Sequence, residues 1–537
     1  MALTGENLIG ATRSAEGLRR LRGIDPRTST TLEPAFAEAT SAEVNRAMEL
    51  ADAAFREFRL VPDSRRADLL EAIAGAIRSQ GESIVARAAS ETGLPEARLR
   101  GEVGRTTGQL ELFAKLVRDG SWVDARIDLG DPSRTPAAKP DVRRMLIALG
   151  PVVVFGTSNF PLAFSVAGGD TASALAAGCS VVVKGHPAHP GTSELVAACV
   201  LAATKQTNLP DGIFSLLHGS GHEVGVELVN HPLTRAVGFT GSLRGGRALF
   251  DAATKRAVPI PVFAEMGSTN PVFILPRALE MQREKLATAL HASVTLGVGQ
   301  FCTNPGVAIL PPTEEANEFK RSLSELVRET PAGPMLYEGI GLAFEEGVKR
   351  MAAVSGVALL ARADGSEQAG TTFGRSAVLT VSAGDYLDHP ELGDEVFGPS
   401  TLVVDTQSRQ DILRLARSLE GHLTATVWAA DGEIDEYQDL VDILTDKVGR
   451  LIFNGMPTGV EVGPAMHHGG PYPATTDARF TSVGTAAILR FARPIAFQDA
   501  PETMLPPHLQ DKNPHGIMRL VDGVPSREPV TRQEDAA

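Results

Sequence analysis

Apolar residues recur every three or four positions between residues 41 and 120, with breaks at proline and glycine. This spacing predicts a series of amphipathic helices. From residue 120 to residue 142 the chain is polar and contains several prolines, and apolar residues alternate with others along Val123–Leu129. A period of two predicts an exposed strand, so we expect a protruding hairpin in this stretch.

After Pro151 the pattern changes to short apolar runs separated by alanine-rich segments with helical spacing. Strands are expected at Val152–Phe155, Ser180–Lys184, Phe214–Leu217, Ala236–Phe239 and Val262–Ala264. Helices are expected at Ser165–Ala177, Thr192–Thr207, Glu223–Val229 and Leu243–Thr254. This alternation predicts a parallel, doubly wound sheet, which binds ligands at the carboxyl ends of its strands.

A second alternation of strands and helices starts at Val272 and predicts a second α/β domain. Its strands are expected at Val272–Ile274, Val307–Leu310, Ala377–Val381 and Leu402–Val404, and a helix at Glu315–Thr330. Further on, Thr485–Phe497 repeats the alternation of an exposed strand. The chain from Asp499 onward is rich in proline and lacks a clear period.

Length and charge narrow the class of protein. A chain of 537 residues is too long for one hydrophobic core, which predicts two large domains with smaller attachments. The net charge of −14 argues against nucleic acid and anionic membranes as partners.

The chain shows no sign of export or membrane insertion. Its first residues contain no basic stretch followed by an apolar core. The longest apolar run, Met145–Phe155, is far shorter than the roughly 20 residues that span a bilayer. Cys179, Cys199 and Cys302 form an odd set without the spacing of metal ligands. We therefore expect a cytoplasmic protein with no disulfide and no metal site.

Cys302 is the first candidate for chemistry, because it follows a glycine-punctuated turn at Gly299. A thiolate is a strong nucleophile, although a single cysteine is more often a buried apolar residue. Glu265 favours the catalytic interpretation. It lies between apolar residues at a predicted strand end, where desolvation raises the pKa of a carboxyl toward that of a general base.

Two polar residues follow the first strands of the predicted parallel sheet. The Asn159 amide and the Cys302 backbone N–H are suited to stabilise an alkoxide formed by thiolate addition, by about 3 kcal/mol. Lys184 ends the next strand, where lysines meet ligand oxygens. The alternatives are a turn-capping asparagine and a solvated surface lysine.

Two glycine-rich turns, Gly219–Gly225 and Gly238–Ser242, also follow strands. Neither is a strict dinucleotide fingerprint, but Gly241 and Ser242 open a predicted helix and offer backbone N–H groups to a pyrophosphate. Together the turns indicate a dinucleotide. Later, Glu395 is suited to bind ribose hydroxyls, with an exposed turn as the alternative.

In order and spacing, these stretches resemble the aldehyde dehydrogenase superfamily from about Glu6 to Gly523. The resemblance implies that Cys302 is the nucleophile, Glu265 the general base and Asn159 the oxyanion donor. It also implies that NAD(P) is bound by the residues that match the family's cofactor positions, namely Lys184, Gly221, Gly225, Gly241, Ser242, Glu395 and Phe397.

The resemblance implies three structural parts and a C-terminal tail. Residues 1–122 and 147–267 match the dinucleotide-binding domain, and residues 268–465 match the catalytic domain. Residues 123–146 and 481–500 match a small β extension through which such enzymes form dimers or tetramers, and residues 501–537 form a C-terminal tail. A homodimer or homotetramer is therefore expected.

Three positions depart from the family pattern. Ser158 replaces a tryptophan, Ser268 replaces a glycine, and Pro187 replaces a glutamate that often follows the lysine. A glutamate there repels a 2′-phosphate, so its absence favours NADP while leaving NAD open, with Lys184 and His186 as candidate phosphate partners.

Three longer stretches of sequence narrow the choice of substrate. The stretches at 105–110, 300–306 and 468–477 look like the branch that oxidises 2-oxoglutarate semialdehyde, also called 2,5-dioxopentanoate. Arg105 is then the candidate partner of the substrate carboxylate, with Glu102 as its alternative partner, and Phe160 is expected to contact the substrate. Other interpretations are a long-chain or other aliphatic aldehyde dehydrogenase, a coenzyme A-acylating enzyme and a non-catalytic dinucleotide-binding scaffold.

Overall fold

The five apolar runs between residues 152 and 265 form the parallel part of a seven-stranded sheet in the computed structural model, which describes residues 2–364 and 373–531. In spatial order the strands are β11 (Val262–Glu265), β10 (Ala236–Thr240), β7 (Val152–Phe155), β8 (Val181–Lys184), β9 (Phe214–Leu217), β1 (Asn7–Ile9) and β2 (Thr12–Ser14). The first five are parallel, and β1 runs antiparallel to β9. The predicted doubly wound sheet is confirmed.

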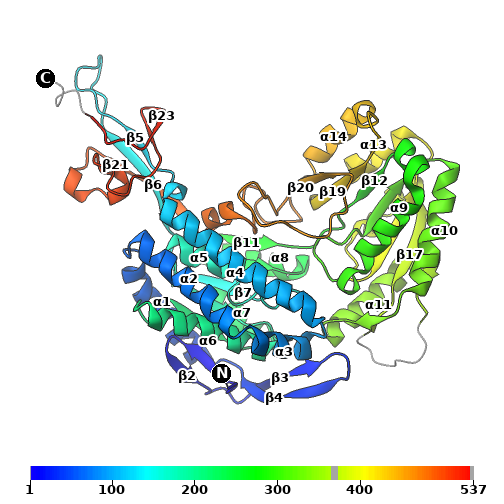
Figure 1. The fold of residues 1–537 in the computed structure, drawn as a ribbon, viewed down its shortest axis with the longest axis horizontal. Coiled ribbons are helices and arrows are strands. Elements are labelled where there is room, and N and C mark those ends of the chain that lie inside the picture. The colour runs from blue at the N-terminus through cyan, green and yellow to red at the C-terminus, as the bar shows by residue number, and fades with distance from the viewer. Residues whose placement is uncertain (1, 365–372, 532–537) are drawn as a thin grey trace.

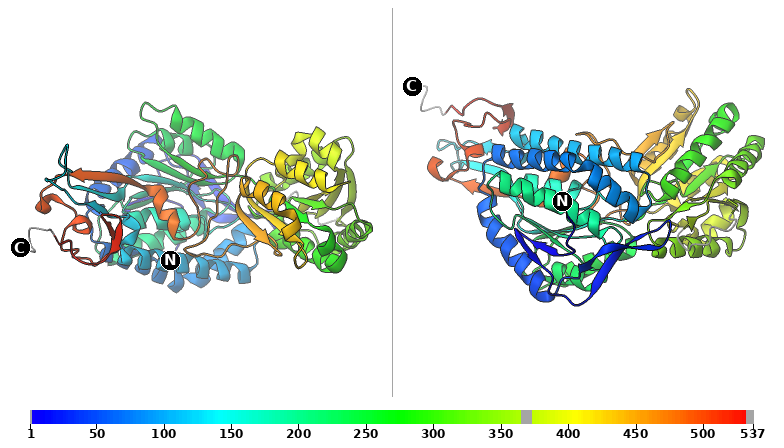
Figure 2. Two further views of the ribbon diagram at one scale, coloured as in Figure 1. Left: turned by 90° about the horizontal axis from the view of Figure 1, so that it is seen from above. Right: turned by 60° about the horizontal axis from the view of Figure 1, so that its bottom comes forward.

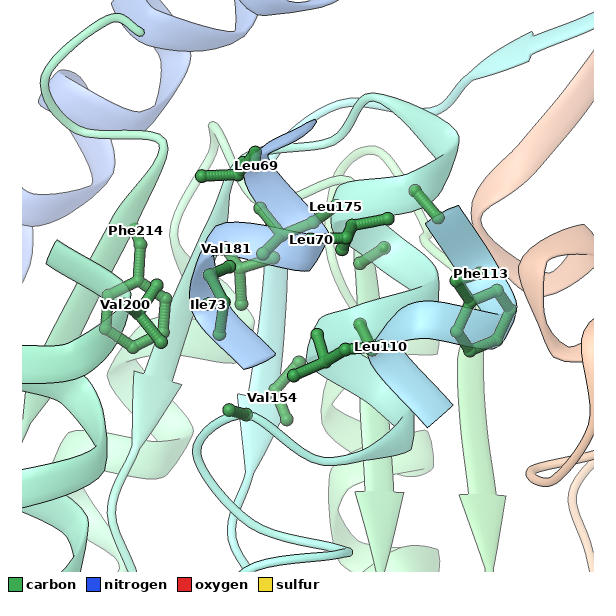
Figure 3. Packing of buried hydrophobic residues seen from close by; sticks show 14 of the residues in the cluster. Leu69, Leu70, Ile73, Leu110, Phe113, Val154, Leu175, Val181, Val200 and Phe214 are labelled. Carbon is green, nitrogen blue, oxygen red and sulfur yellow. The ribbon is translucent and has the colours of Figure 1, made fainter. Parts of the chain in front are cut away.

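Helices cover both faces of this sheet, so its central strands carry apolar residues that point to both faces. Val153 packs in one core with α1, α7 and α8, while Val154 packs in the other with α2, α4, α5 and α6. Figure 3 shows Val154 and Val181 beside Ile73 of α2 and Leu110 of α4. The helices are α1 (Ser41–Phe58), α2 (Asp63–Ser79), α3 (Gly81–Thr92), α4 (Glu96–Asp119), α5 (Gly169–Ala177), α6 (Pro190–Gln206), α7 (Glu223–Asn230) and α8 (Leu243–Thr254).

The second α/β unit is likewise built on a seven-stranded sheet with helices packed against it (Figure 1). Its sheet order is β15 (Ala358–Arg362), β17 (Ala377–Ser382), β18 (Ser400–Asp405), β13 (Val307–Leu310), β12 (Val272–Ile274), β19 (His422–Trp428) and β20 (Val448–Phe453). Only β15 pairs antiparallel with its neighbour. The helices are α9 (Pro276–Thr295), α10 (Glu314–Glu329), α11 (Glu338–Ala352), α12 (Ala383–Asp388), α13 (Arg409–Ser418) and α14 (Gln438–Thr445).

Two short ribbons complete these units. The antiparallel pair β3 (Arg20–Asp25) and β4 (Thr30–Ala37) contacts α3, and β14 (Gly333–Pro334) pairs with β16 (Phe373–Gly374). The four N-terminal strands β1 to β4 are outside the helical and strand patterns recognised in the sequence.

A separate five-stranded sheet projects from the first unit, on the side away from the second unit (Figures 1 and 2). Its order is β21 (Ala492–Gln498), β6 (Val142–Ala148), β5 (Arg126–Asp128), β22 (Arg519–Val521) and β23 (Val524–Ser526). The hairpin predicted between residues 120 and 142 therefore contributes one strand, β5, which pairs antiparallel with β6.

One C-terminal prediction needs correction. Thr485–Phe491 is a 3₁₀ helix, η5, rather than the first half of a strand, because Ala487, Ile488 and Phe491 share one buried face. The proline-rich chain after Asp499 also contains order, since Leu505, Leu509 and Ile517 pack in the main core and β22 pairs with β5. Backbone pairing leaves no apolar period, so the sequence pattern gave no signal for it.

No helix in the described part of the chain is both long and apolar enough to cross a membrane. The longest helix, α4, carries charged residues from its first position, Glu96, to its last, Asp119.

Candidate active site

Cys302 follows a tight turn whose shape depends on glycine. Gly299 has a φ of 67°, and a Cβ at this position would lie 2.3 Å from the backbone of Gly398, so only glycine fits. The side-chain amide of Asn270 donates hydrogen bonds to the carbonyl oxygens of Cys302 and Asn304, at 2.8 and 2.9 Å. These contacts fix the cysteine backbone while its residue stays partly exposed.

Glu265 is the last residue of β11 and is buried, with 3 % of its surface exposed. Its Oε2 atom accepts a hydrogen bond from the Ser482 hydroxyl, whereas its Oε1 atom has no hydrogen-bond partner among the described residues. Burial raises the pKa of the Glu265 carboxyl to about 7, against the opposing effect of Ser482. The carboxyl therefore exchanges a proton near neutral pH.

His468 joins these two groups. Its Nε2 atom lies 3.6 Å from Cys302 Sγ and 3.6 Å from Glu265 Oε1. Burial, with the nearby Arg450 and Arg105 charges, lowers the pKa of His468 to about 3, so the imidazole is neutral at neutral pH. A neutral imidazole carries one nitrogen lone pair that accepts a hydrogen bond.

The electrostatics of Cys302 favour the thiol at rest. Burial raises the pKa of the Cys302 thiol well above its ordinary value, and the neighbouring Glu265 carboxylate adds to this effect. Arg105 acts in the opposite direction. A base that removes the thiol proton is therefore needed before the sulfur reacts, and Glu265 is close enough to affect its pKa directly.

Asn159 follows β7 and lies beside the cysteine loop. Its Nδ2 atom donates a hydrogen bond of 3.1 Å to the carbonyl oxygen of Gln300, and its backbone carbonyl accepts one of 2.6 Å from Arg98. An amide nitrogen carries two N–H groups, so one remains for a ligand oxygen near Cys302.

The Arg105 guanidinium lies over two aromatic rings of the same region. Its guanidinium carbon lies 5.5 Å from the Phe160 ring centroid and 5.2 Å from that of Phe164. Its Nε and Nη2 atoms are buried and have no hydrogen-bond partner in the described part of the chain. Glu102, the alternative partner, instead accepts backbone N–H groups of Leu162 and Ala163 through Oε1. Arg105 is thus a partly buried cation with two buried donor nitrogens that have no partner among the described residues.

The carboxyl edge of the first sheet brings the expected cofactor residues together in order. Lys184 ends β8 and is buried, and burial lowers the pKa of its ammonium to about 8 while Glu38 raises it. His186 stacks on His189 with ring centroids 5.5 Å apart. Burial lowers the pKa of His186 well below its usual value, so it is not a cation at neutral pH.

The glycine turns serve packing as well as ligand access. Gly225 lies in α7, where a Cβ would be 2.9 Å from the Phe155 ring, and Gly221 lies close to the Glu223 carboxylate. Ser242 caps α8 by accepting the Gly245 N–H. The Gly241 N–H is donated to the Glu265 carbonyl at 3.0 Å, so this amide is already paired.

Glu395 approaches the turn that follows Glu265. A Cβ on Gly267 would lie 2.5 Å from Glu395 Oε2, which explains the glycine at this position. Burial raises the pKa of the Glu395 carboxyl to about 7. Glu395 and Phe397 line one cavity together with Phe301.

Ser268, which departs from the family pattern, is accommodated by polar contacts. Its hydroxyl donates to Asn270 Oδ1 at 3.0 Å and accepts the backbone N–H of Leu423 at 3.0 Å. The serine therefore ties the loop after β11 to β19 of the second sheet.

His468 and Ser482 were not predicted from the sequence as individual members of the site. Both belong to the loop between β20 and η5 and lie far from Cys302 and Glu265 in the chain. The only signal was the string that contains His468, which was used for the resemblance and not for chemistry.

Comparisons with known proteins show which family the whole chain resembles. A family model described as "Aldehyde dehydrogenase family" matches residues 12–471. The chain is 48 % identical over 527 residues to a protein named alpha-ketoglutaric semialdehyde dehydrogenase 2 from Azospirillum brasilense, covering 97 % of this chain and 99 % of that protein. It is 43 % identical over 526 residues to alpha-ketoglutaric semialdehyde dehydrogenase from Acinetobacter baylyi, covering 97 % and 98 %.

The fold also matches solved structures. A structure of 3,6-anhydro-L-galactose dehydrogenase in complex with NAP superimposes with a TM-score of 0.78 at 23 % identity. The match covers 92 % of this chain and 99 % of the other. At this identity the likeness establishes the fold alone.

Proposed function

The chain belongs to the aldehyde dehydrogenase family, and we propose that it oxidises 2-oxoglutarate semialdehyde (2,5-dioxopentanoate) to 2-oxoglutarate with NADP. The observation that supports this substrate is the Arg105 guanidinium, whose buried Nε and Nη2 atoms have no hydrogen-bond partner among the described residues. Arg105 also affects the pKa of Cys302, so the cation and the sulfur share one region. A substrate with an aldehyde at one end and a carboxylate at the other can present its aldehyde to the Cys302 sulfur and pair its carboxylate with Arg105.

In the proposed mechanism Cys302 is the nucleophile. Glu265 removes the thiol proton, and the sulfur adds to the aldehyde carbon to form a thiohemiacetal. The remaining Asn159 N–H and the Cys302 backbone N–H stabilise the oxyanion, by about 3 kcal/mol for a well-placed donor. A nicotinamide held at this site would accept the hydride, and Cys302 would then carry the thioester.

Hydrolysis of the thioester completes the proposed reaction. Glu265, with a pKa of about 7, first releases the thiol proton to solvent. It then takes a proton from water as the water adds to the thioester carbonyl, and the Cys302 thiolate leaves. The need for this base separates the proposal from a coenzyme A-acylating enzyme, whose thioester is transferred to another thiol.

The residues at the carboxyl edge of the first sheet fit a dinucleotide. Lys184 presents a buried cation, Gly225 lets α7 approach β7 closely, and Glu395 is a carboxylate in the cavity that also contains Phe397. We propose that Lys184 contacts the adenosine ribose and that Glu395 contacts the nicotinamide ribose.

Preference for NADP is supported by Pro187, which stands where a carboxylate often opposes a 2′-phosphate. Lys184 is the cation proposed for that phosphate. His186, the second sequence candidate, is neutral and offers only hydrogen bonding. The buried Glu38 carboxylate interacts with Lys184 and therefore limits the preference for NADP over NAD.

We also propose that the five-stranded sheet that includes β6 and β21 mediates a homodimer or a homotetramer. The first α/β unit, from residues 1–122 and 147–267, then binds the cofactor, and residues 268–465 supply the nucleophile. Sedimentation equilibrium of the full chain tests the assembly, and a native mass equal to one chain would contradict it.

A steady-state panel tests the proposed activity. Turnover of 2,5-dioxopentanoate, succinic semialdehyde and hexanal is compared with NADP and with NAD. We expect the highest kcat/KM for 2,5-dioxopentanoate with NADP. A preference for hexanal would favour the aliphatic alternative, which the rings of Phe160, Phe164 and Phe301 support as an apolar lining.

A further inference from the structure

The active-site cluster has the composition of a transition-metal site. Glu265, Cys302 and His468 each offer one ligand atom, and these three atoms all lie within 4.8 Å of one another. A carboxylate, a thiolate and an imidazole are all ligands that Zn²⁺ accepts. Sequence spacing gave no sign of this group, because the three residues come from distant parts of the chain.

The separations fit one bound ion. With Zn–S of about 2.3 Å and Zn–N and Zn–O of about 2.0 Å at tetrahedral angles, sulfur and nitrogen are about 3.5 Å apart, and nitrogen and oxygen about 3.3 Å. In the structure both separations, from His468 Nε2 to Cys302 Sγ and to Glu265 Oε1, are 3.6 Å. Small side-chain rotations are enough to bring the three atoms into coordination.

A second observation points to a missing ligand at this place. Glu265 Oε1 is a buried carboxylate oxygen without a hydrogen-bond partner in the described residues, and it faces His468 Nε2. Leaving such an atom unpaired is unfavourable for folding. A metal ion between the two atoms would satisfy both lone pairs at once.

We propose that Glu265, Cys302 and His468 form a three-ligand site for Zn²⁺ or Co²⁺, and that occupation of this site reversibly blocks the enzyme. On binding, the Cys302 thiol releases its proton to solvent and its sulfur bonds to the metal, with no change in oxidation state. The fourth position is left for water, and partial exposure of Cys302 gives the ion a route from the cleft.

Charges around the site limit its affinity and selectivity. Arg105 and Arg450 both interact electrostatically with Cys302, so they oppose a divalent cation and make the metal removable by chelators. The sulfur and nitrogen ligands favour Zn²⁺ and Co²⁺ over Mg²⁺ and Ca²⁺, which prefer oxygen.

The binding test uses the full-length enzyme without aldehyde or cofactor. Titration with Co²⁺ is expected to produce a near-ultraviolet thiolate-to-cobalt charge-transfer band that saturates at one ion per chain. His468→Gln, which keeps a side chain of similar length but offers a weak amide ligand, is expected to weaken binding at least about tenfold. Cys302→Ser is expected to abolish the band. His467→Gln, a neighbouring and partly buried histidine outside the cluster, is the matched control and keeps the band.

The inhibition test adds Zn²⁺ to the enzyme during turnover. Inhibition by Zn²⁺, reversal by EDTA and no effect of Mg²⁺ are expected in the wild type and in His467→Gln. Absence of a Co²⁺ band in the folded wild type, or equal Zn²⁺ sensitivity of His468→Gln, overturns the proposal. The inhibition rests on the proposed catalytic roles, but the band does not. A chain that binds Co²⁺ yet turns over no aldehyde would therefore refute the proposed function alone.

Discussion

Glu265 Oε1 and His468 Nε2 face each other 3.6 Å apart inside the protein, and neither group is held by an opposite charge across this gap. The imidazole is neutral because burial and two nearby arginines lower its pKa to about 3. The carboxyl therefore has no cation at this position to stabilise its ionised form. Burial therefore raises the pKa of Glu265 to about 7, within the range useful to a general base.

The first prediction concerns pH. Because Glu265 acts only when deprotonated and its pKa is raised to about 7, kcat should rise with pH through about 7 and level off above it. Ser482 donates to the carboxylate and lowers its pKa, so Ser482→Ala should move the inflection to higher pH. Steady-state rates measured across a pH series check both points. An unchanged inflection in the variant would remove Glu265 as the titrating group.

The second prediction concerns the substrate carboxylate. Arg105→Met keeps an apolar stem against Phe160 and Phe164 but removes the charge. We expect kcat/KM for 2,5-dioxopentanoate to fall about 100-fold, the effect of losing charge-assisted hydrogen bonds worth about 3 kcal/mol, while kcat/KM for hexanal changes little.

Arg100→Met is the matched control for this prediction. Arg100 belongs to the same helix but pairs on the surface with Glu82 and Glu96, so its loss should affect neither substrate. Equal losses for both substrates in Arg105→Met would indicate a structural role for Arg105 instead.

Periodicity was sufficient to predict most of the two α/β units. The strand at Val152–Phe155 and the helix at Leu243–Thr254 were predicted with their observed bounds, because strands buried on both faces and amphipathic helices leave strong local patterns. The strand predicted through residue 497 failed in its first half. Short apolar stretches fit either period, and the burial of Ala487 and Ile488 against α5 decided the outcome.

Single residues of the site could also be predicted only where their local sequence is distinctive. Cys302 and Glu265 were identified because each stands out from its local surroundings, as an isolated thiol and as a carboxylate at an apolar strand end. His468 has no such context, and only the path of the loop between β20 and η5 brings it to both of them. The sequence also could not show that Arg105 keeps unpaired donors, because this depends on Glu102 accepting backbone N–H groups instead of pairing with Arg105.

The third prediction concerns the cofactor. Lys184→Met removes the buried cation at the end of β8, so kcat/KM for NADP should fall at least about tenfold more than kcat/KM for NAD. Glu38→Gln removes the carboxylate that interacts with Lys184 and should raise the ratio of NADP to NAD use. Lys205→Met, an exposed lysine near the end of α6, serves as the control. Identical losses for both cofactors in Lys184→Met would place the lysine away from the 2′-phosphate.

The last prediction separates the two halves of the reaction. Glu265→Gln keeps the size of the side chain and a group able to contact Ser482 but removes the base. Because the Cys302 thiol can also lose its proton to solvent, mixing this variant with aldehyde and NADP should still release up to one reduced cofactor per site, more slowly than in the wild type. Turnover after this burst should be about 100-fold or more below the wild type, since thioester hydrolysis depends on Glu265. Stopped-flow absorbance of reduced nicotinamide measures both phases, and mass spectrometry of the quenched protein should find the acyl group on Cys302. Full steady-state activity in this variant would show that another group activates the water.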